Sequence, residues 1–171
     1  DKFKATLSAG EVVTTIALEL QAAGHLVDGL PLADGGDGTI DVVLDHGFEG
    51  RETPTVDGHG RPRTGVIAWR GDEAIVEMAQ ACGLATVIDL VPDPWRASSL
   101  GLGLAARAAL DAGASSVTLA LGGSASIDGG VGLLEGLGFT VLDRRGRQVT
   151  PDLAGLVKVH AIESREVGGV W

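Results

Sequence analysis

The sequence predicts a mixed α/β protein with a parallel sheet, because helical patterns alternate with short apolar strands and glycine-rich loops join them. Capping-box spacing from Ser8 to Glu11 opens one helical pattern, and Gly24 suits its end. A second helical pattern covers residues 98–112 and is followed by the buried-strand pattern 116–121. This alternation of strands and helices is typical of βα units.

Four further elements follow from the same patterns. A strand is expected around residues 26–32, and a short helix should follow the glycine-rich loop after it. Another short helix is expected around residues 132–137. Residues 139–142 and 147–149 then predict a last hairpin, since an Arg-Gly turn separates them.

The pattern changes between residues 51 and 84. Three strands are expected there, over residues 53–56, 64–69 and 74–77, and turn-forming sequences lie between them. Strands joined by such short turns pair antiparallel, unlike the strands of the flanking βα units. The change therefore predicts an inserted or second domain.

Composition and charge exclude several classes of function. Hydrophobic residues make up 44% of the 171-residue chain, which favours a packed core over disorder. A formal net charge of −10 argues against a surface for nucleic acid or anionic lipid. No apolar run is long enough to span a membrane. We therefore expect neither a nucleic-acid nor a membrane partner.

Cys82 is the only cysteine of the chain. It lies in the apolar string 78–82, where a small buried side chain is a better interpretation than a catalytic thiol. A single cysteine cannot form an intrachain disulfide, which favours a reducing compartment. We therefore expect a cytoplasmic protein.

Both ends of the sequence indicate a piece of a longer protein. The chain begins at Asp1 inside a loop that has no strand before it, and residues 166–171 carry no clear helix or strand pattern. A parallel sheet that lacks a strand exposes an apolar edge. We therefore expect the isolated segment to be poorly active and prone to associate.

Three loops combine glycines with Ser, Thr, Asp or Lys beside a predicted helix start, at residues 1–8, 34–39 and 122–130. Glycine lets backbone N–H groups approach an anion, and a helix N-terminus adds unpaired donors. Carboxylates beside such donors suit the coordination of Mg²⁺ or the activation of a hydroxyl group. The loops therefore indicate a site for phosphate and a divalent cation.

Each loop also has a simpler structural interpretation. Lys4 can neutralise a phosphate or a substrate carboxylate, or it can be a solvated surface lysine. Asp34 and Asp37 can converge on one cation, or they can cap a tight turn between a strand and a helix. Residues 122–130 have the composition of a phosphate cradle, but a flexible loop has a similar composition.

Other patterns carry less weight. Residues 101–106 satisfy the dinucleotide pattern G-x-G-x-x-A, but no strand precedes them, so close helix packing is the better interpretation. No P-loop pattern and no G-x-S-x-G frame occur, and the four histidines lack zinc-ligand spacing. The hypothesis of a nucleotide-dependent oxidoreductase therefore rests on Gly101, Gly103 and Ala106 alone.

Five motifs, taken in their order, resemble the bacterial glycerate kinase family of the GarK and GlxK type, type 1. They are DKFKATLSA at 1–9, PLADGGDGT at 31–39, VEMAQACGL at 76–84, DPWRASSLG at 93–101 and LGGSASIDGGVG at 121–132. Ala5 stands where the family usually has glycine, and Ile127 where it usually has a polar residue. The resemblance covers nearly the whole chain to about residue 156.

The resemblance implies an enzyme that moves the γ-phosphoryl group of ATP to glycerate and gives 2-phosphoglycerate or 3-phosphoglycerate. It implies a flavodoxin-like α/β domain with an inserted second α/β domain, both incomplete here, and an active site in the cleft between them. The first domain would comprise residues 1–50 and about 93–132. The second would comprise residues 51–92 and about 133–171.

We assign roles to the residues of the three loops on both grounds. Coordination of Mg²⁺ or activation of a hydroxyl group is assigned to Asp34, Asp37 and Asp128. Binding of phosphate or substrate is assigned to Ser8, Gly35, Gly36, Asp37, Gly122, Gly123 and Ser124. Lys4 is expected to contact glycerate or the transferred phosphoryl group, and with Asp34 and Asp128 it completes the predicted catalytic residues.

Alternatives stay open at this point. The first is a truncated, non-catalytic module that keeps the fold for binding or assembly, and the second is the oxidoreductase. The sequence does not decide between the 2- and 3-hydroxyl groups of glycerate. It also leaves open whether the protein forms a homo-oligomer.

Overall fold

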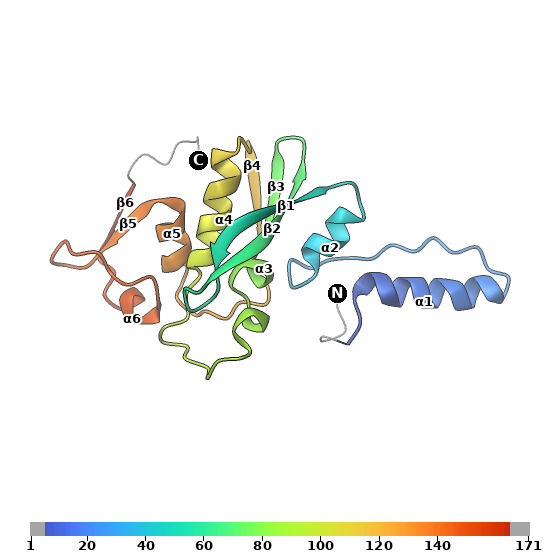
Figure 1. Ribbon diagram of the computed structural model, residues 1–171, viewed down its shortest axis with the longest axis horizontal. Coiled ribbons are helices and arrows are strands. Elements are labelled where there is room, and N and C mark those ends of the chain that lie inside the picture. Colours follow the sequence, from blue (N-terminus) through green and yellow to red (C-terminus); the bar gives the residue numbers. More distant parts are fainter. Residues whose placement is uncertain (1–5, 165–171) are drawn as a thin grey trace.

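A four-stranded sheet forms the centre of the protein (Figure 1). The computed structural model describes residues 6–164. The strands are β1 (Glu49–Val56), β2 (Pro62–Arg70), β3 (Glu73–Glu77) and β4 (Ser116–Ala120), and they lie in that order. β1 pairs with β2 and β2 with β3 in antiparallel fashion, whereas β3 and β4 are parallel. The predicted mixed α/β architecture is confirmed, and so are the hairpins predicted between residues 51 and 84.

The sheet carries the main hydrophobic core on the side of helix α4 (Leu100–Asp111). Short α3 (Met78–Cys82) follows β3 directly and packs against α4, and a 3-10 turn, η1 (Leu84–Val87), comes next. Core side chains come from β2, β3, α3 and α4, and Leu102 at the centre is fully buried. Cys82 is also fully buried, as the sequence predicted.

Two glycines of α4 allow unusually close packing. A Cβ atom at Gly101 would lie 2.0 Å from the carbonyl oxygen of Val56 in β1. One at Gly103 would lie 2.3 Å from the carbonyl oxygen of Leu133, in helix α5 (Val131–Leu137). Both glycines lie inside a helix, so their spacing reflects packing rather than a dinucleotide loop.

A small second sheet lies at the other end of α5. β5 (Phe139–Leu142) pairs antiparallel with β6 (Ala161–Ser164), and α6 (Leu153–Leu156) lies between them in sequence. The hairpin predicted with residues 147–149 is present in a short form: Leu142 and Gln148 form an antiparallel bridge, and the Val149 N–H donates to the Val141 carbonyl oxygen (3.0 Å). The Asp143 carboxylate accepts hydrogen bonds from the Arg147 backbone N–H and guanidinium and closes the tight turn between the two segments.

An arm formed by α1 (Ala9–Ala22) and the segment 25–33 extends away from the sheet (Figure 1). Its capping box at Ser8 is confirmed, but no residue of α1 is buried. The strand predicted at residues 26–32 was wrong. Residues 25–33 are not assigned to a strand, and Leu26 is fully exposed. After the arm, α2 (Thr39–Leu44) returns to the sheet.

The predicted division into two domains stays a prediction. β4 belongs to one predicted domain and β3 to the other, yet the two strands pair in one sheet. Within residues 6–164, no helix combines the length and apolar character needed to cross a membrane.

Candidate active site

A cavity of about 420 Å³ lies between the start of α1 and the loop before α2. Its walls come from the predicted first and second loops, which are 25 or more residues apart in sequence. Thr6, Leu7 and Ser8 line one side, and Asp34 and Asp37 line the other. The structure therefore brings together two of the three loops that the sequence singled out.

The cavity is strongly acidic. Five carboxylates line it, those of Glu11, Asp34, Asp37, Asp41 and Asp45. Hydrogen bonds from Ser8 hold the pKa of Glu11 below its ordinary value, so this carboxylate is charged at neutral pH. Among the residues 6–164 that are described, no Lys, Arg or His lines the cavity. The carboxylates of the described lining favour a cation in the cavity over an anion without one.

The side chains present suit a magnesium ion that arrives with a nucleotide. Mg²⁺ prefers carboxylate oxygens and commonly takes only one or two of them, together with phosphate oxygens and water. No group of three His, Cys, Asp or Glu residues within 6–164 is arranged to hold a metal ion. Asp34 and Asp37 both line the cavity, and two carboxylates are the number that a cation shared with a ligand commonly takes from a protein.

The second loop is folded tightly between these two aspartates. Asp34, which is exposed, accepts a hydrogen bond from the Gly36 N–H (2.8 Å). The Thr39 hydroxyl donates to the Gly36 carbonyl oxygen (2.7 Å), and Gly38 has a φ of +95°, which glycine adopts readily. Both structural interpretations of the loop, as a turn and as a cation site, therefore draw on the same residues.

Glu77 was missed by sequence reasoning. It is the last residue of β3 and is fully buried. Its two carboxylate oxygens accept hydrogen bonds from the Gly38 N–H (3.1 Å) and the Ile40 N–H (2.7 Å). A carboxylate thus already occupies the N-terminus of α2, where the sequence suggested room for a phosphate. A charged residue ending the apolar strand 74–77 was the available signal.

The third loop lies directly behind the second. The Gly122 N–H donates to the Gly35 carbonyl oxygen (2.8 Å), and a Cβ atom at Gly122 would lie 2.4 Å from the Gly36 Cα. Gly123 has a φ of +72°. Glycine at 122 is therefore required for contact between the two loops, whereas its N–H is not available to a ligand.

Ser124 is held inside the third loop. Its hydroxyl lies 3.1 Å from both the carbonyl oxygen and the hydroxyl of Ser126, and it accepts a hydrogen bond from the Ser126 N–H (3.0 Å). Among the hydrogen bonds found over residues 6–164, none uses the backbone N–H of Gly123 or Ser124. These two N–H groups therefore have no hydrogen-bond acceptor within residues 6–164.

The place of Asp128 in a glycine-rich loop predicts an exposed side chain, and this prediction was wrong, because Asp128 is buried with an exposed fraction of 2%. Its Oδ2 accepts hydrogen bonds from the Ser99 N–H, the Ser99 hydroxyl and the Gly132 N–H, at 2.7–3.1 Å. Its Oδ1 accepts one from the Gly130 N–H (3.2 Å). Asp128 therefore joins the start of α4 to the start of α5.

Two predicted residues of the first loop remain. Ser8 lines the cavity, and its hydroxyl accepts a hydrogen bond from the Glu11 N–H (3.1 Å) in the capping box. The Ser8 hydroxyl proton can still be donated to a ligand. Lys4 lies outside the described residues.

The family is decided by the match of residues 1–169 to the model of the glycerate kinase family. The chain belongs to the glycerate kinase family. Its order of loops, first and second around the cavity and third behind the second, is thus that of a family member.

Individual relatives agree with this placement. The chain is 35% identical over 169 residues to a glycerate kinase of Bacillus subtilis, and the match covers 95% of this chain and 44% of the relative. It is 32% identical over 155 residues to the glycerate 2-kinase of Escherichia coli, covering 87% of this chain and 40% of the relative. The chain thus spans less than half the length of these relatives.

A solved structure gives the same answer for the fold. It is described as a candidate glycerate kinase 2 of Salmonella typhimurium LT2 and is 32% identical to this chain. The TM-score is 0.78, and the match covers 99% of this chain and 47% of that one. The relationship therefore extends along the whole of the present chain.

Proposed function

We propose that this chain is part of an ATP-dependent glycerate kinase, which transfers the γ-phosphoryl group of ATP to a hydroxyl group of glycerate. The observation that carries the proposal is the meeting of the family's acidic loops around one cavity, at Asp34 and Asp37. Phosphoryl transfer depends mainly on positioning and on neutralising charge. A loop with carboxylates for Mg²⁺ beside a loop with free N–H donors suits both needs.

The roles of the loops divide accordingly. Asp34 and Asp37 would hold Mg²⁺, which when bound neutralises charge on the phosphate oxygens. Backbone N–H groups of Gly123 and Ser124 would receive phosphate oxygens, and Gly122 keeps the two loops in contact. Ser8, and Lys4 beyond the described residues, would bind glycerate or the transferred group. Either Asp34 or Asp37 can also accept the proton of the attacking hydroxyl group.

Asp128 takes a different role in this proposal. Four hydrogen bonds, three of them from backbone N–H groups, occupy its oxygens, and it is buried. A carboxylate in that position is poorly placed to bind a metal ion directly. We assign Asp128 to positioning the third loop on α4, in place of a direct catalytic role.

The product follows from a relative only. The Escherichia coli relative is named glycerate 2-kinase, and on that ground we propose 2-phosphoglycerate over 3-phosphoglycerate. Glycerate and Mg-ATP are the proposed small-molecule partners, and cytoplasmic location stays a prediction.

A non-catalytic module is the second candidate. It is favoured by the length of the chain, which is less than half that of the relatives, and by the exposed arm.

In the oxidoreductase alternative, Gly101 and Gly103 would have to contact a dinucleotide. Both are buried in α4 against protein backbone, which removes its basis.

The test is Asp34→Asn in a polypeptide of the relatives' length, assayed for glycerate-dependent ADP formation over a range of Mg²⁺ concentrations. We expect the rate at limiting Mg²⁺ to fall at least about tenfold, as is usual when a metal site is perturbed. Asp111→Asn removes a charge from the surface end of α4 and serves as the matched control. Wild-type behaviour of Asp34→Asn at every Mg²⁺ concentration would remove Asp34 from the site.

A further inference from the structure

A buried carboxylate on the central sheet is hydrogen-bonded to the second loop, residues 34–39, and to the helix that follows it. Glu77 ends β3, is fully buried, and reaches α2 from a position 37 residues later in the sequence than Ile40. Its partners include backbone N–H groups of the loop and of the first turn of α2, at Gly38 and Ile40. One side chain therefore connects the sheet to the segment that carries Asp34 and Asp37.

The arrangement requires a carboxylate in particular. Each Glu77 oxygen accepts one N–H, Oε1 from Gly38 and Oε2 from Ile40. A glutamine has the same shape but offers one acceptor and one N–H₂ donor, so one loop N–H would face another donor. The Ile40 N–H is buried and could not turn to water instead, whereas the Gly38 contact is only partly buried. Loss of either hydrogen bond would loosen the hold of β3 on the loop.

Movement of this turn affects the metal-binding side chains directly. Asp37 directly precedes Gly38 in the chain. The Asp34 carboxylate accepts a hydrogen bond from the N–H of Gly36, which lies two residues before Gly38. The opposite side of the loop is fixed by the Gly122 N–H on the Gly35 carbonyl oxygen. Gly122 therefore holds the start of the second loop, and Glu77 holds its end.

We propose that Glu77 is a positioning residue of the phosphoryl-transfer site, which orients Asp34 and Asp37 toward Mg²⁺ without touching the ion or the substrate. This inference rests on the proposed function. Partners that orient the ligands of a metal typically contribute about 10- to 100-fold to its affinity. Glu77 acts in this way through the backbone of the loop.

Binding of Mn²⁺ as a stand-in for Mg²⁺, followed by electron paramagnetic resonance with ATP present, tests the proposal without an activity assay. We expect Glu77→Gln to weaken Mn²⁺ binding at least about tenfold. Amide hydrogen exchange of the same protein should show faster exchange at Gly38 or Ile40. Glu77→Asp keeps two acceptors on a shorter side chain, so its Mn²⁺ affinity should lie between those of wild type and Glu77→Gln. If Glu77→Gln does not fold, Glu77→Asp takes its place in the test.

Two controls separate positioning from a general loss of stability. Val141→Ala removes volume from the small core beside β5, far from the loop in sequence, and should lower the melting temperature with unchanged Mn²⁺ affinity. Glu73→Gln removes a carboxylate from the exposed start of β3 and should change neither. If the folded Glu77 variants bind Mn²⁺ as tightly as wild type does, Glu77 has only a structural role and the inference is wrong. If wild type itself binds no Mn²⁺ with ATP present, the metal assignment in the proposed function fails instead.

Discussion

At the scale of single residues, three carboxylates accept hydrogen bonds from the starts of helices. Glu11 closes a capping box, Glu77 binds the start of α2, and Asp128 binds the starts of α4 and α5. The capping box could be predicted because its partners are three residues apart. The contacts of Glu77 with α2 and of Asp128 with Ser99 could not, because these partners lie 29 to 39 residues away in sequence. Sequence reasoning therefore singled out the loop of Asp128 without its partners in the protein, and the role of Asp128 at Mg²⁺ or a hydroxyl group stays a prediction.

Asp128→Asn tests this assignment. An asparagine presents an N–H₂ group to some of the four donors that now face the carboxylate, and an unpaired buried donor costs about 1–3 kcal/mol. We expect the free energy of unfolding, measured with urea, to fall by about that amount. A variant with wild-type stability and a strongly reduced rate of phosphoryl transfer would return Asp128 to the catalytic residues.

At the scale of elements, the sequence predicted helices and strands best where their signals lie close together in the chain. The strands β2 and β3 and the helix α4 were expected close to their observed bounds, because alternation, turn residues and capping are local signals, whereas β1 begins four residues before the expected start at residue 53. The strand expected at residues 26–32 was wrong because an apolar run becomes a strand only beside a partner strand. The glycines of α4 look like a binding motif in sequence, and only the contacts of Gly101 with β1 and of Gly103 with α5 show their purpose.

Gly103→Ala tests that contact. The new methyl group would lie within 2.3 Å of the Leu133 carbonyl oxygen and 2.9 Å of the Gly136 Cα, so α4 and α5 would have to separate. Overpacking of this kind costs about 1–3 kcal/mol, which should appear as a lower urea midpoint. The matched control is Gly10→Ala in α1, where the nearest atom to the new methyl is 3.9 Å away and stability should not fall. Equal stability of both variants would show that α4 and α5 tolerate separation.

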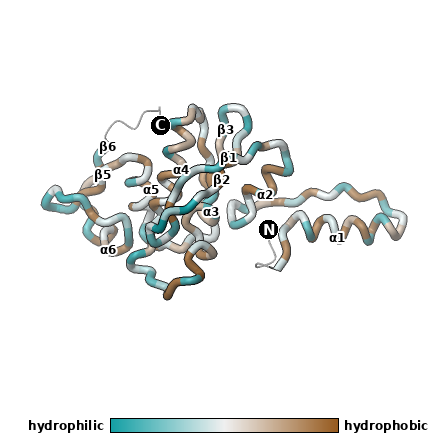
Figure 2. The backbone as a smooth tube through the Cα atoms, viewed as in Figure 1, coloured by the Kyte–Doolittle hydropathy of each residue, from teal (hydrophilic) through white to brown (hydrophobic). Residues whose placement is uncertain are grey.

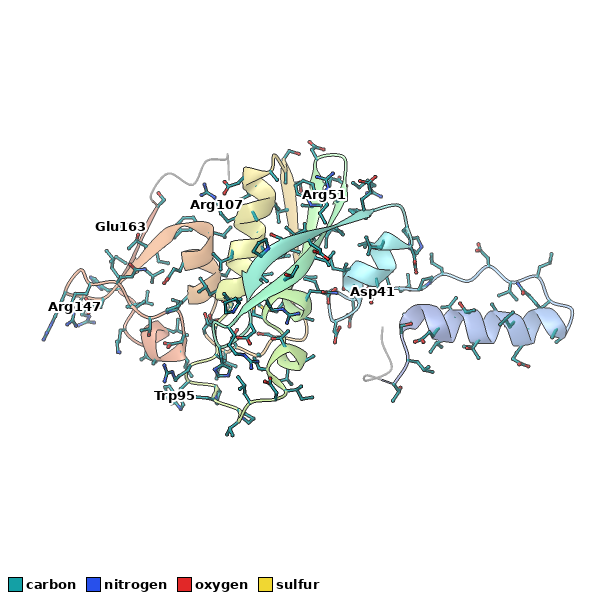
Figure 3. All side chains as sticks on the ribbon, in the orientation of Figure 1. Asp41, Arg51, Trp95, Arg107, Arg147 and Glu163 are labelled. Carbon is teal, nitrogen blue, oxygen red and sulfur yellow. The ribbon has the colours of Figure 1, made fainter. Side chains whose placement is uncertain are left out.

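At the scale of the whole molecule, the arm is the least protected part. Leucine and isoleucine side chains of α1 and of residues 25–33 are exposed, with exposed fractions of 61% at Leu18 and 65% at Leu32 and full exposure at Leu26. Figure 2 shows hydrophobic positions, in brown, along this arm, and Figure 3 shows its side chains as sticks around the ribbon. The sequence anticipated an exposed apolar edge, but it expected the edge of a sheet rather than an extended arm. Apolar surface of this extent is usually covered by another protein surface.

Self-association of the 171-residue chain is therefore expected. Analytical ultracentrifugation over a range of micromolar concentrations should show species larger than the monomer. Replacing Leu26 and Leu30 with glutamate puts charges on the arm, away from the central core, and should shift the distribution toward monomer. Charge changes at Arg144 and Arg145, in the turn after β5, serve as the control. A wild-type chain that stays monomeric throughout would show that the arm needs no cover.

The most direct test of the account is phosphorus NMR of ATP, Mg²⁺ and glycerate with a polypeptide of the relatives' length that contains these residues. The account predicts loss of the γ-phosphate signal of ATP and growth of a phosphoglycerate signal, only when both Mg²⁺ and glycerate are present. The position of the new signal identifies the phosphorylated hydroxyl group, for which we expect 2-phosphoglycerate. A folded polypeptide that leaves ATP and glycerate unchanged under these conditions would contradict the assignment of this chain to a glycerate-phosphorylating enzyme.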